Sequence, residues 1–215
     1  MTEAMLDIIK KEYPLEKIDA GEFAQMKVSG MKFNICAYHA KGLGHVSVMT
    51  AKGFFGLMKM DTLIIVPQEK DLPLYSYDRI KAMGNDKLYL ELYNTLTGDF
   101  TSSLDEVKSK YSSLPDFDPG KHWYDNIKMS QSVFKTGKKM GNTFDELVID
   151  YLKAYLDAGK NSSATFDTSV KDQKSQAYVN GLIKNGGPST DVFKKAIGEE
   201  KTAMLFKKVL FGTQV

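Results

Sequence analysis

Cysteine, histidine, arginine and tryptophan are scarce in this chain of 215 residues, which has one cysteine (Cys36), one arginine (Arg79), one tryptophan and three histidines. A lone cysteine cannot form an internal disulfide, which is typical of chains in a reducing compartment. It also cannot build a thiolate metal site or an iron–sulfur site. Cys36 is either a reactive thiol or a small core residue, and the second interpretation is favoured.

Long apolar runs are missing as well. No stretch reaches the length of a membrane span, and Glu3 and Asp7 interrupt the region where a signal peptide needs an apolar core. We therefore expect a cytoplasmic protein. The 29 lysine and arginine residues nearly balance 27 acidic residues, for a net charge of +2, which argues against nucleic acid as the main partner. The length fits a single domain, residues 1–215.

Motifs for tightly bound cofactors are not found either. Gly42 and Gly44 do not complete a dinucleotide-binding fingerprint, and no lysine-bearing phosphate loop is present. His39, His45 and His122 lack helical spacing and a carboxylate companion, so we interpret them as surface or strand residues rather than metal ligands. The sequence predicts neither a metal nor a redox cofactor held by the protein.

Alternation of apolar and polar residues dominates the first half of the chain. A short helix over residues 2–12 is predicted to end at Pro14. From Phe23 onward the pattern has a period of two, with glycines at the reversals, and it continues through the apolar run 63–66. The connections are too short for crossover helices. We therefore expect an antiparallel meander.

Helical periodicity takes over after Thr95. Two pairs, Ser103 with Glu106 and Thr143 with Glu146, have the spacing of capping boxes. The second pair precedes the strongest apolar stripe, which ends at Gly159. Strands followed by helices predict an antiparallel sheet covered on one or both faces. No helix or strand is predicted for residues 121–140. The later helices are predicted around residues 170–184, from about 189 to 197, and up to Phe211.

The segment around residue 91 carries the most chemical feature of the sequence. Tyr89, Glu91 and Tyr93 share one face of a predicted strand, and three leucines share the other. Glu91 is either a buried proton donor, or else a solvent-facing strand residue or a salt-bridge partner. The tyrosines at 75, 77, 89 and 93 either line a pocket for a flat ligand or contribute ordinary packing, and spacing alone favours packing.

The run VPQEKDLPLYSYDRI resembles a segment of the ferredoxin-dependent bilin reductases. In that family an apolar strand ends at a proline, here Pro67, and an Asp-Leu-Pro triplet follows, here starting at Asp71. An aspartate then closes the next strand, here Asp78, and the acidic residue beneath the bilin falls on Glu91. The C-terminal part is similar as well, and the match there is carried by Tyr178, Asn185, Gly198, Leu210 and Phe211. The red chlorophyll catabolite reductases belong to the same superfamily.

This resemblance implies an α/β fold, a three-layer α/β/α sandwich with a central antiparallel sheet. It implies an oxidoreductase that reduces a linear tetrapyrrole, or a related conjugated pigment, with electrons from ferredoxin and no cofactor of its own. Glu91 would be the catalytic acid. Arg79 would either clamp the propionates of the pigment or face solvent. The residues that would bind the substrate are Tyr75, Asp78, Arg79, Tyr89, Tyr93 and Asn185.

Departures from the family pattern leave catalysis open. Glu91 stands where the family has aspartate, and Gly186 stands where a second aspartate typically follows the asparagine. The histidine that some members place near Leu74 or Tyr75 is also absent. The Gly186 departure favours an alternative, a tetrapyrrole-binding or other small-molecule-binding protein without turnover. Docking of acidic ferredoxin would need a basic patch, and the candidate lysines are 121, 128, 135, 138 and 139, or 194, 195, 207 and 208.

Overall fold

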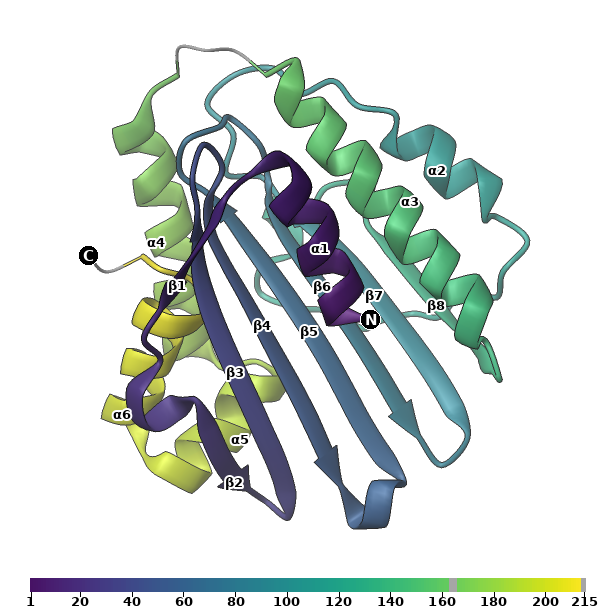
Figure 1. The fold of residues 1–215 in the computed structure, drawn as a ribbon, viewed down its shortest axis with the longest axis vertical. Coiled ribbons are helices and arrows are strands. Elements are labelled where there is room, and N and C mark those ends of the chain that lie inside the picture. The colour runs from purple at the N-terminus through teal and green to yellow at the C-terminus, as the bar shows by residue number, and fades with distance from the viewer. Residues whose placement is uncertain (163–165, 214–215) are drawn as a thin grey trace.

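The computed structural model describes residues 1–162 and 166–213. Within them, one antiparallel sheet has the strand order β1-β3-β4-β5-β6-β7-β8, and β2 pairs with β3 (Figure 1). The predicted meander is confirmed, since β3 to β7 follow one another in space as in sequence. The strands are β1 (Leu15–Ile18), β2 (Gln25–Val28), β3 (Met31–Ala40), β4 (Gly44–Gly53), β5 (Met58–Pro67), β6 (Leu74–Ala82), β7 (Asn85–Tyr93) and β8 (Val133–Lys138).

Helices cover both faces of the sheet, so the predicted three-layer sandwich is confirmed (Figure 1). We call the face toward the viewer of Figure 1 the front face and the other the back face. The front face carries α1 (Thr2–Glu12), α2 (Leu104–Lys110) and α3 (Gly141–Lys160). The back face carries α4 (Thr168–Asn185), α5 (Pro188–Ile197), α6 (Glu199–Met204) and the π-helical turn η4 (Leu205–Leu210). In the described part of the chain, no helix combines the length and apolarity that a membrane crossing requires.

Strand alternation supplies side chains to two separate cores. Along β5, Leu63 and Ile65 enter the front core, whereas Ile64 and Val66 enter the back core. The front core is closed by α1 and by the apolar stripe of α3, and the back core by α4, α5 and η4. Each central strand therefore contributes to both cores at once.

The start of α3 differs from the prediction. The helix begins at Gly141, and the amide of Phe144 donates to the carbonyl of Met140 at 2.9 Å, so the first turn closes before Thr143 is reached. In α2, the Ser103 side chain makes no capping hydrogen bond, although the helix starts directly after it. Both predicted capping boxes are therefore wrong, because backbone bonds complete these first turns instead.

The unassigned segment 121–140 turns out to complete the sheet. It contains the short turn η3 (Asp125–Ile127) and then β8, which pairs with β7. An isolated bridge also joins Lys128 to Tyr93. The segment thereby reaches the same strand that carries Glu91.

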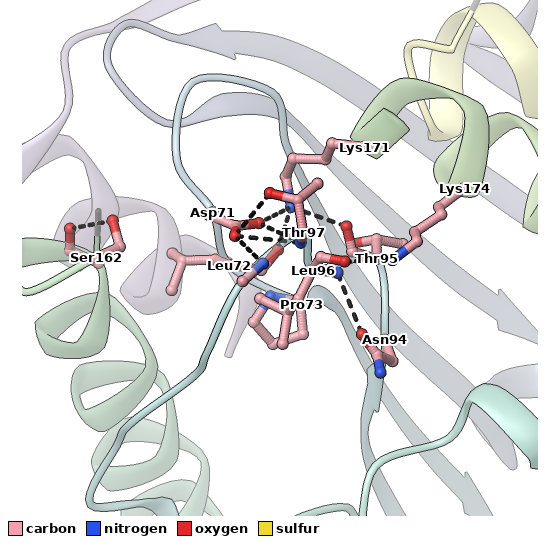
Figure 2. A network of polar contacts seen from close by, with 12 residues as sticks. Asp71, Leu72, Pro73, Asn94, Thr95, Leu96, Thr97, Ser162, Lys171 and Lys174 are labelled. Carbon is pink, nitrogen blue, oxygen red and sulfur yellow. Dashed lines mark hydrogen bonds and ion pairs between the residues drawn. The ribbon is translucent and has the colours of Figure 1, made fainter. Parts of the chain in front are cut away.

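A buried polar network fixes α4 against the ends of β6 and β7 (Figure 2). The ammonium of Lys171 is fully buried, donates to the carbonyl of Leu72 at 2.5 Å and lies 3.5 Å from Asp71. Asp71 in turn accepts from the hydroxyl of Thr97 at 3.0 Å and from the amide of Gly98 at 2.9 Å. Burial lowers the pKa of Lys171 to about 8. The network thus joins two loops and one helix.

The two edges of the sheet are short or interrupted. β1 and β2 share one edge, where each pairs four residues with a different half of β3, and the 3₁₀ turn η1 (Gly21–Phe23) lies between them. At the other edge, an isolated bridge joins Asp116 to Lys135 of β8. Neither edge offers a long uninterrupted row of free backbone groups.

Candidate functional site

Three neighbouring strands place polar side chains together on the back face. Thr62 of β5 lies opposite Asp78 of β6, and Asp78 lies opposite Tyr89 of β7. Ser76 lies opposite Glu91 in the next row of the same face. Diagonal neighbours on one sheet face are about 7–8 Å apart, so the two carboxyl groups share one site. We call these five residues the β6–β7 site.

Asp78 is the more strongly perturbed carboxyl group. The hydroxyl of Thr62 donates to its Oδ1 at 2.5 Å, and the hydroxyl of Ser76 approaches its Oδ2 at 3.4 Å. Burial raises the pKa of Asp78 to about 7, against the hydrogen bond from Thr62, and the nearby Glu91 adds to the rise. A group with this pKa is present in both its protonated and its ionised form at neutral pH.

Glu91 is buried and paired rather than solvent-facing. It is 8% exposed, and its Oε1 lies 3.5 Å from the ammonium of Lys128, which also contacts Asp125 at 2.8 Å. Burial raises the pKa of Glu91, and the charge of Lys128 opposes that rise. The solvent-facing interpretation is therefore wrong and the salt-bridge interpretation is confirmed, while the role of this buried carboxyl as a proton donor stays a prediction.

Aromatic rings border the two acids. Tyr93 packs against Tyr178 of α4 with ring centroids 4.5 Å apart, and against Tyr124 at 5.5 Å. On the other side, Tyr89 meets Phe117 edge to face at 5.0 Å. The first three rings are buried, whereas Tyr89 is partly exposed and offers accessible ring area beside the carboxyl groups.

The site is open toward the ends of the hairpins, where the back-face helices no longer cover the sheet. Met60, Asp78, Ile80 and Tyr89 are each partly exposed, whereas Leu74, higher on β6, is fully buried. In the other direction along the same face, a cavity of about 360 Å³ opens beside Val66, Gln68 and Ser175. Small-molecule pockets typically measure about 300–1,000 Å³.

Two residues predicted for this site lie on the other face of the sheet. Tyr75 is buried in the front core against Tyr155, with ring centroids 5.0 Å apart. Arg79 is 2% exposed and donates to Asp86 at 2.6 and 2.9 Å, and to Asp145. The prediction that Tyr75 and Arg79 share a site with Glu91 is wrong, because alternate residues of β6 point to opposite faces.

Asn185 lies at the exposed last turn of α4, next to the glycine that ends the helix. Gly186 has a φ of +83°, which favours glycine, and a Cβ placed there would lie 2.8 Å from Oδ1 of Asp191. The indole of Trp123 donates to the Gly186 carbonyl at 3.2 Å. A carboxylate thus lies beside this position even though the sequence has no acid at residue 186.

Three contributors to the site were not predicted. Ser76 shares its strand face with Asp78, so the alternation of β6 contained a usable signal. Thr62 reaches Asp78 only through the register between β5 and β6. Lys128 comes from the segment that showed no periodicity, and no pattern in the sequence placed it beside Glu91.

The histidines make contacts unrelated to this site, with one exception. His45 is buried and bonds to the carbonyl of Val209 at 2.8 Å, and His39 lies 3.3 Å from Glu69. His122 stacks on Tyr124 with ring centroids 4.9 Å apart and so lies at the border of the site. Across residues 1–162 and 166–213, no three His, Cys, Asp or Glu side chains gather as metal ligands would.

A comparison with protein-family models finds no match, and neither does a comparison with curated proteins. Among solved structures, the chain is similar to phytochromobilin synthase from tomato, whose crystal structure holds biliverdin. The TM-score is 0.80 over 99% of this chain and 82% of that chain, at 14% sequence identity. The two proteins share one fold. The fold predicted from the sequence, a three-layer α/β/α sandwich with a central antiparallel sheet, is thereby shared with a solved protein.

Proposed function

We propose that this protein reduces a linear tetrapyrrole, or a related conjugated pigment, bound against the back face at the β6–β7 site. The observation that carries the proposal is the pair Asp78 and Glu91, one partly exposed and one buried carboxyl group, both with raised pKa values, on an aromatic-bordered sheet face. The fold shared with phytochromobilin synthase, which was solved with biliverdin, supports the choice of ligand class.

Reduction of one double bond in such a pigment consumes two electrons and two protons. The electrons come from an external donor, and we assign that role to ferredoxin. Asp78 and Glu91 supply protons, since a carboxyl group whose pKa lies near the working pH is an efficient general acid. Asp78, at about 7, is the better matched of the two.

The propionates of the pigment need cationic partners, and Arg79 is on the wrong face. Lys87 shares the back face with Tyr89, is exposed, and has its ammonium 4.8 Å from the centre of the Phe117 ring. We assign Lys87 the contact with a propionate. Lys128 lies closer to the acids but is held by Glu91 and Asp125.

Ferredoxin docking has fewer free lysines than the sequence indicated. Lys128 is engaged at the site, and Lys135 is buried 2.8 Å from Asp116. In the other group, Lys195 and Lys208 are exposed on the helices of the back face. In the first group, Lys121, Lys138 and Lys139 are exposed as well, so both groups stay candidates for the docking surface.

The test is an anaerobic absorbance titration with biliverdin, followed by reduced ferredoxin. We expect a shifted bilin band that then bleaches or moves.

Asp78→Asn and Glu91→Gln should still bind biliverdin but lose about 10²–10⁴-fold in rate, because each removes one general acid. Asp61→Asn, on the front face of β5, is the matched control and should keep the rate. Unchanged turnover in both site variants would contradict the mechanism.

A binding protein without turnover is the second candidate, and Gly186 in place of the family's second acid favours it. In that case the biliverdin band would shift on binding and stay constant when reduced ferredoxin is added. No shift at all would show that this fold serves another ligand, and the bilin assignment would be withdrawn.

A further inference from the structure

Four large apolar side chains protrude from one end of the sheet and belong to neither the front core nor the back core. Phe54, Phe55 and Leu57 form the β4–β5 turn and are 55%, 108% and 64% exposed. Met83 forms the neighbouring β6–β7 turn and is 85% exposed. The amide of Met83 donates to the carbonyl of Leu57 at 3.2 Å, so the two turns are in contact. We call these four residues the apolar tip; both turns lie at the lower end of the sheet in Figure 1.

The backbone conformation of the two turns does not explain why apolar residues stand there. Phe54, Phe55 and Met83 have φ values of 50°, 55° and 50°, in the left-handed region that glycine, asparagine and aspartate adopt most readily. An apolar side chain at such a position costs folding free energy and gains no burial here. A local rule broken without a structural gain is typical of a functional position.

A row of lysines crosses the front face directly behind the apolar tip. Cross-strand partners run Lys27 to Lys32, Lys32 to Lys52, Lys52 to Lys59, and Lys59 to Lys81, across β2 to β6. All five side chains are exposed, and within the described ranges none reaches a carboxylate closely enough to form an ion pair. Like charges directly opposite each other destabilise a sheet. Lys81 also lies opposite Asp86 of β7, but that carboxylate is held by Arg79, so the fold gains little from this row.

We propose that this end of the protein docks on an anionic phospholipid surface, with the apolar tip entering the interface and the lysine row against the headgroups. Lys52 precedes Phe54 by two residues and Lys59 follows Leu57 by two, which corresponds to about 7 Å along a strand. That offset matches the depth of about 5–10 Å to which interfacial apolar groups enter the boundary between headgroups and acyl chains. Segments 52–59 and 81–85 contain no acidic residue.

A lipid surface fits these residues better than an acidic protein does. The phenylalanines project from a turn, whereas protein interfaces bury their apolar residues in a well-packed patch with a polar rim. Only a few side chains enter the lipid interface, so membrane binding is reversible and depends on charge. Each lysine near an anionic leaflet contributes about fivefold to the partition constant. The docking does not depend on the proposed reductase activity.

The test is co-sedimentation of the full chain with vesicles of phosphatidylcholine, with and without phosphatidylserine, at low and high salt. We expect sedimentation with the phosphatidylserine vesicles at low salt, and its loss at high salt or without the anionic lipid. An absence of binding to phosphatidylserine vesicles at low salt would overturn the proposal.

Variants separate the two components of the surface. Lys32→Gln/Lys52→Gln/Lys59→Gln should reduce partition about 100-fold, from about fivefold per lysine. The matched control Lys11→Gln/Lys17→Gln/Lys41→Gln removes the same charge from exposed positions outside the row and should reduce it far less.

Met83→Asn tests the apolar tip without risk of unfolding, because asparagine suits the left-handed turn. It should raise thermal stability and weaken vesicle binding. Equal losses in the lysine variant and its control would overturn the proposal. The proposal would also be overturned by a tip variant that binds vesicles normally but no longer binds an acidic protein such as ferredoxin. The apolar tip would then be a protein interface.

Discussion

Asp78 shows how a single carboxyl group acquires an unusual acidity. Its neighbours donate two hydrogen bonds, which favour the ionised form, yet burial outweighs them and raises the pKa to about 7. Glu91 is more deeply buried but has the charge of Lys128 3.5 Å away. Two acids in one site thus differ in whether a cation lies beside them.

The pKa of Asp78 predicts a pH dependence of folding. The unfolded chain loses this proton near its ordinary pKa of 3.8, and the folded protein near 7, so the folded state binds more protons between these values. The contribution of Asp78 to the free energy of unfolding should therefore fall as pH rises from about 4 to 7. Urea unfolding of the wild type and of Asp78→Asn should show stabilities that diverge over this window by about 1–3 kcal/mol.

Asp61→Asn controls for the loss of one negative charge from the adjacent strand. Its stability should follow that of the wild type across the same pH range. Stability curves of the wild type and Asp78→Asn that stay parallel from pH 4 to 7 would show that Asp78 ionises normally in the folded protein.

Single residues of the site were predictable where strand alternation alone decided their place. Tyr89, Glu91 and Tyr93 share one face as predicted, because they alternate on one strand. Arg79 was misplaced although the same rule applies to it, since it directly follows Asp78 and must point the other way. Lys128 was beyond prediction, because its position depends on a loop with no periodic pattern.

Helix α4 is held in place by the Lys171 network rather than by apolar burial alone. Two helical turns beyond Lys171, Tyr178 packs on Tyr93 beside the site. Lys171 donates to a loop carbonyl and faces Asp71, so it joins the helix to the segments that follow β5 and β7. The placement of one wall of the site therefore depends on a charge buried at some distance from it.

Lys171→Met should destabilise the protein by about 1–3 kcal/mol, because it leaves the Leu72 carbonyl unsatisfied and Asp71 without its cation. Urea unfolding followed by Trp123 fluorescence provides the measurement. Lys184→Met is the matched control, since Lys184 is exposed in the last turn of the same helix, and it should change stability by less than about 0.5 kcal/mol. Equal stabilities of the two variants would contradict a structural role for the network.

Elements with strong periodicity were predictable and elements built by long-range pairing were not. The helix over residues 2–12 and the strands from β3 to β7 follow the predicted pattern. The β8 strand has no clear alternation, with a glycine at 137, and becomes a strand only by pairing with β7. The start of α3 was misplaced because backbone bonds, rather than a side-chain cap, begin the helix at Gly141.

The whole molecule is organised by one sheet that serves two cores. Because β3 to β7 send alternate side chains into both, neither core can unfold while the other keeps its full sheet. We therefore expect a single cooperative thermal transition. Trp123, which contacts the back-face Tyr178, and far-UV circular dichroism should give the same midpoint. Two separated transitions would show that the layers unfold independently.

The interrupted edges of this sheet bear on the behaviour of the protein at high local concentration. Exposed edge strands act as templates onto which another chain can add, and this is a route to aggregation. Here one edge consists of two four-residue strands separated by a turn, and part of β8 is occupied by the Asp116 bridge. A protein that collects on a surface by its apolar tip brings many such edges close together. The broken edges then limit growth of one sheet into the next and help to keep the collected molecules separate.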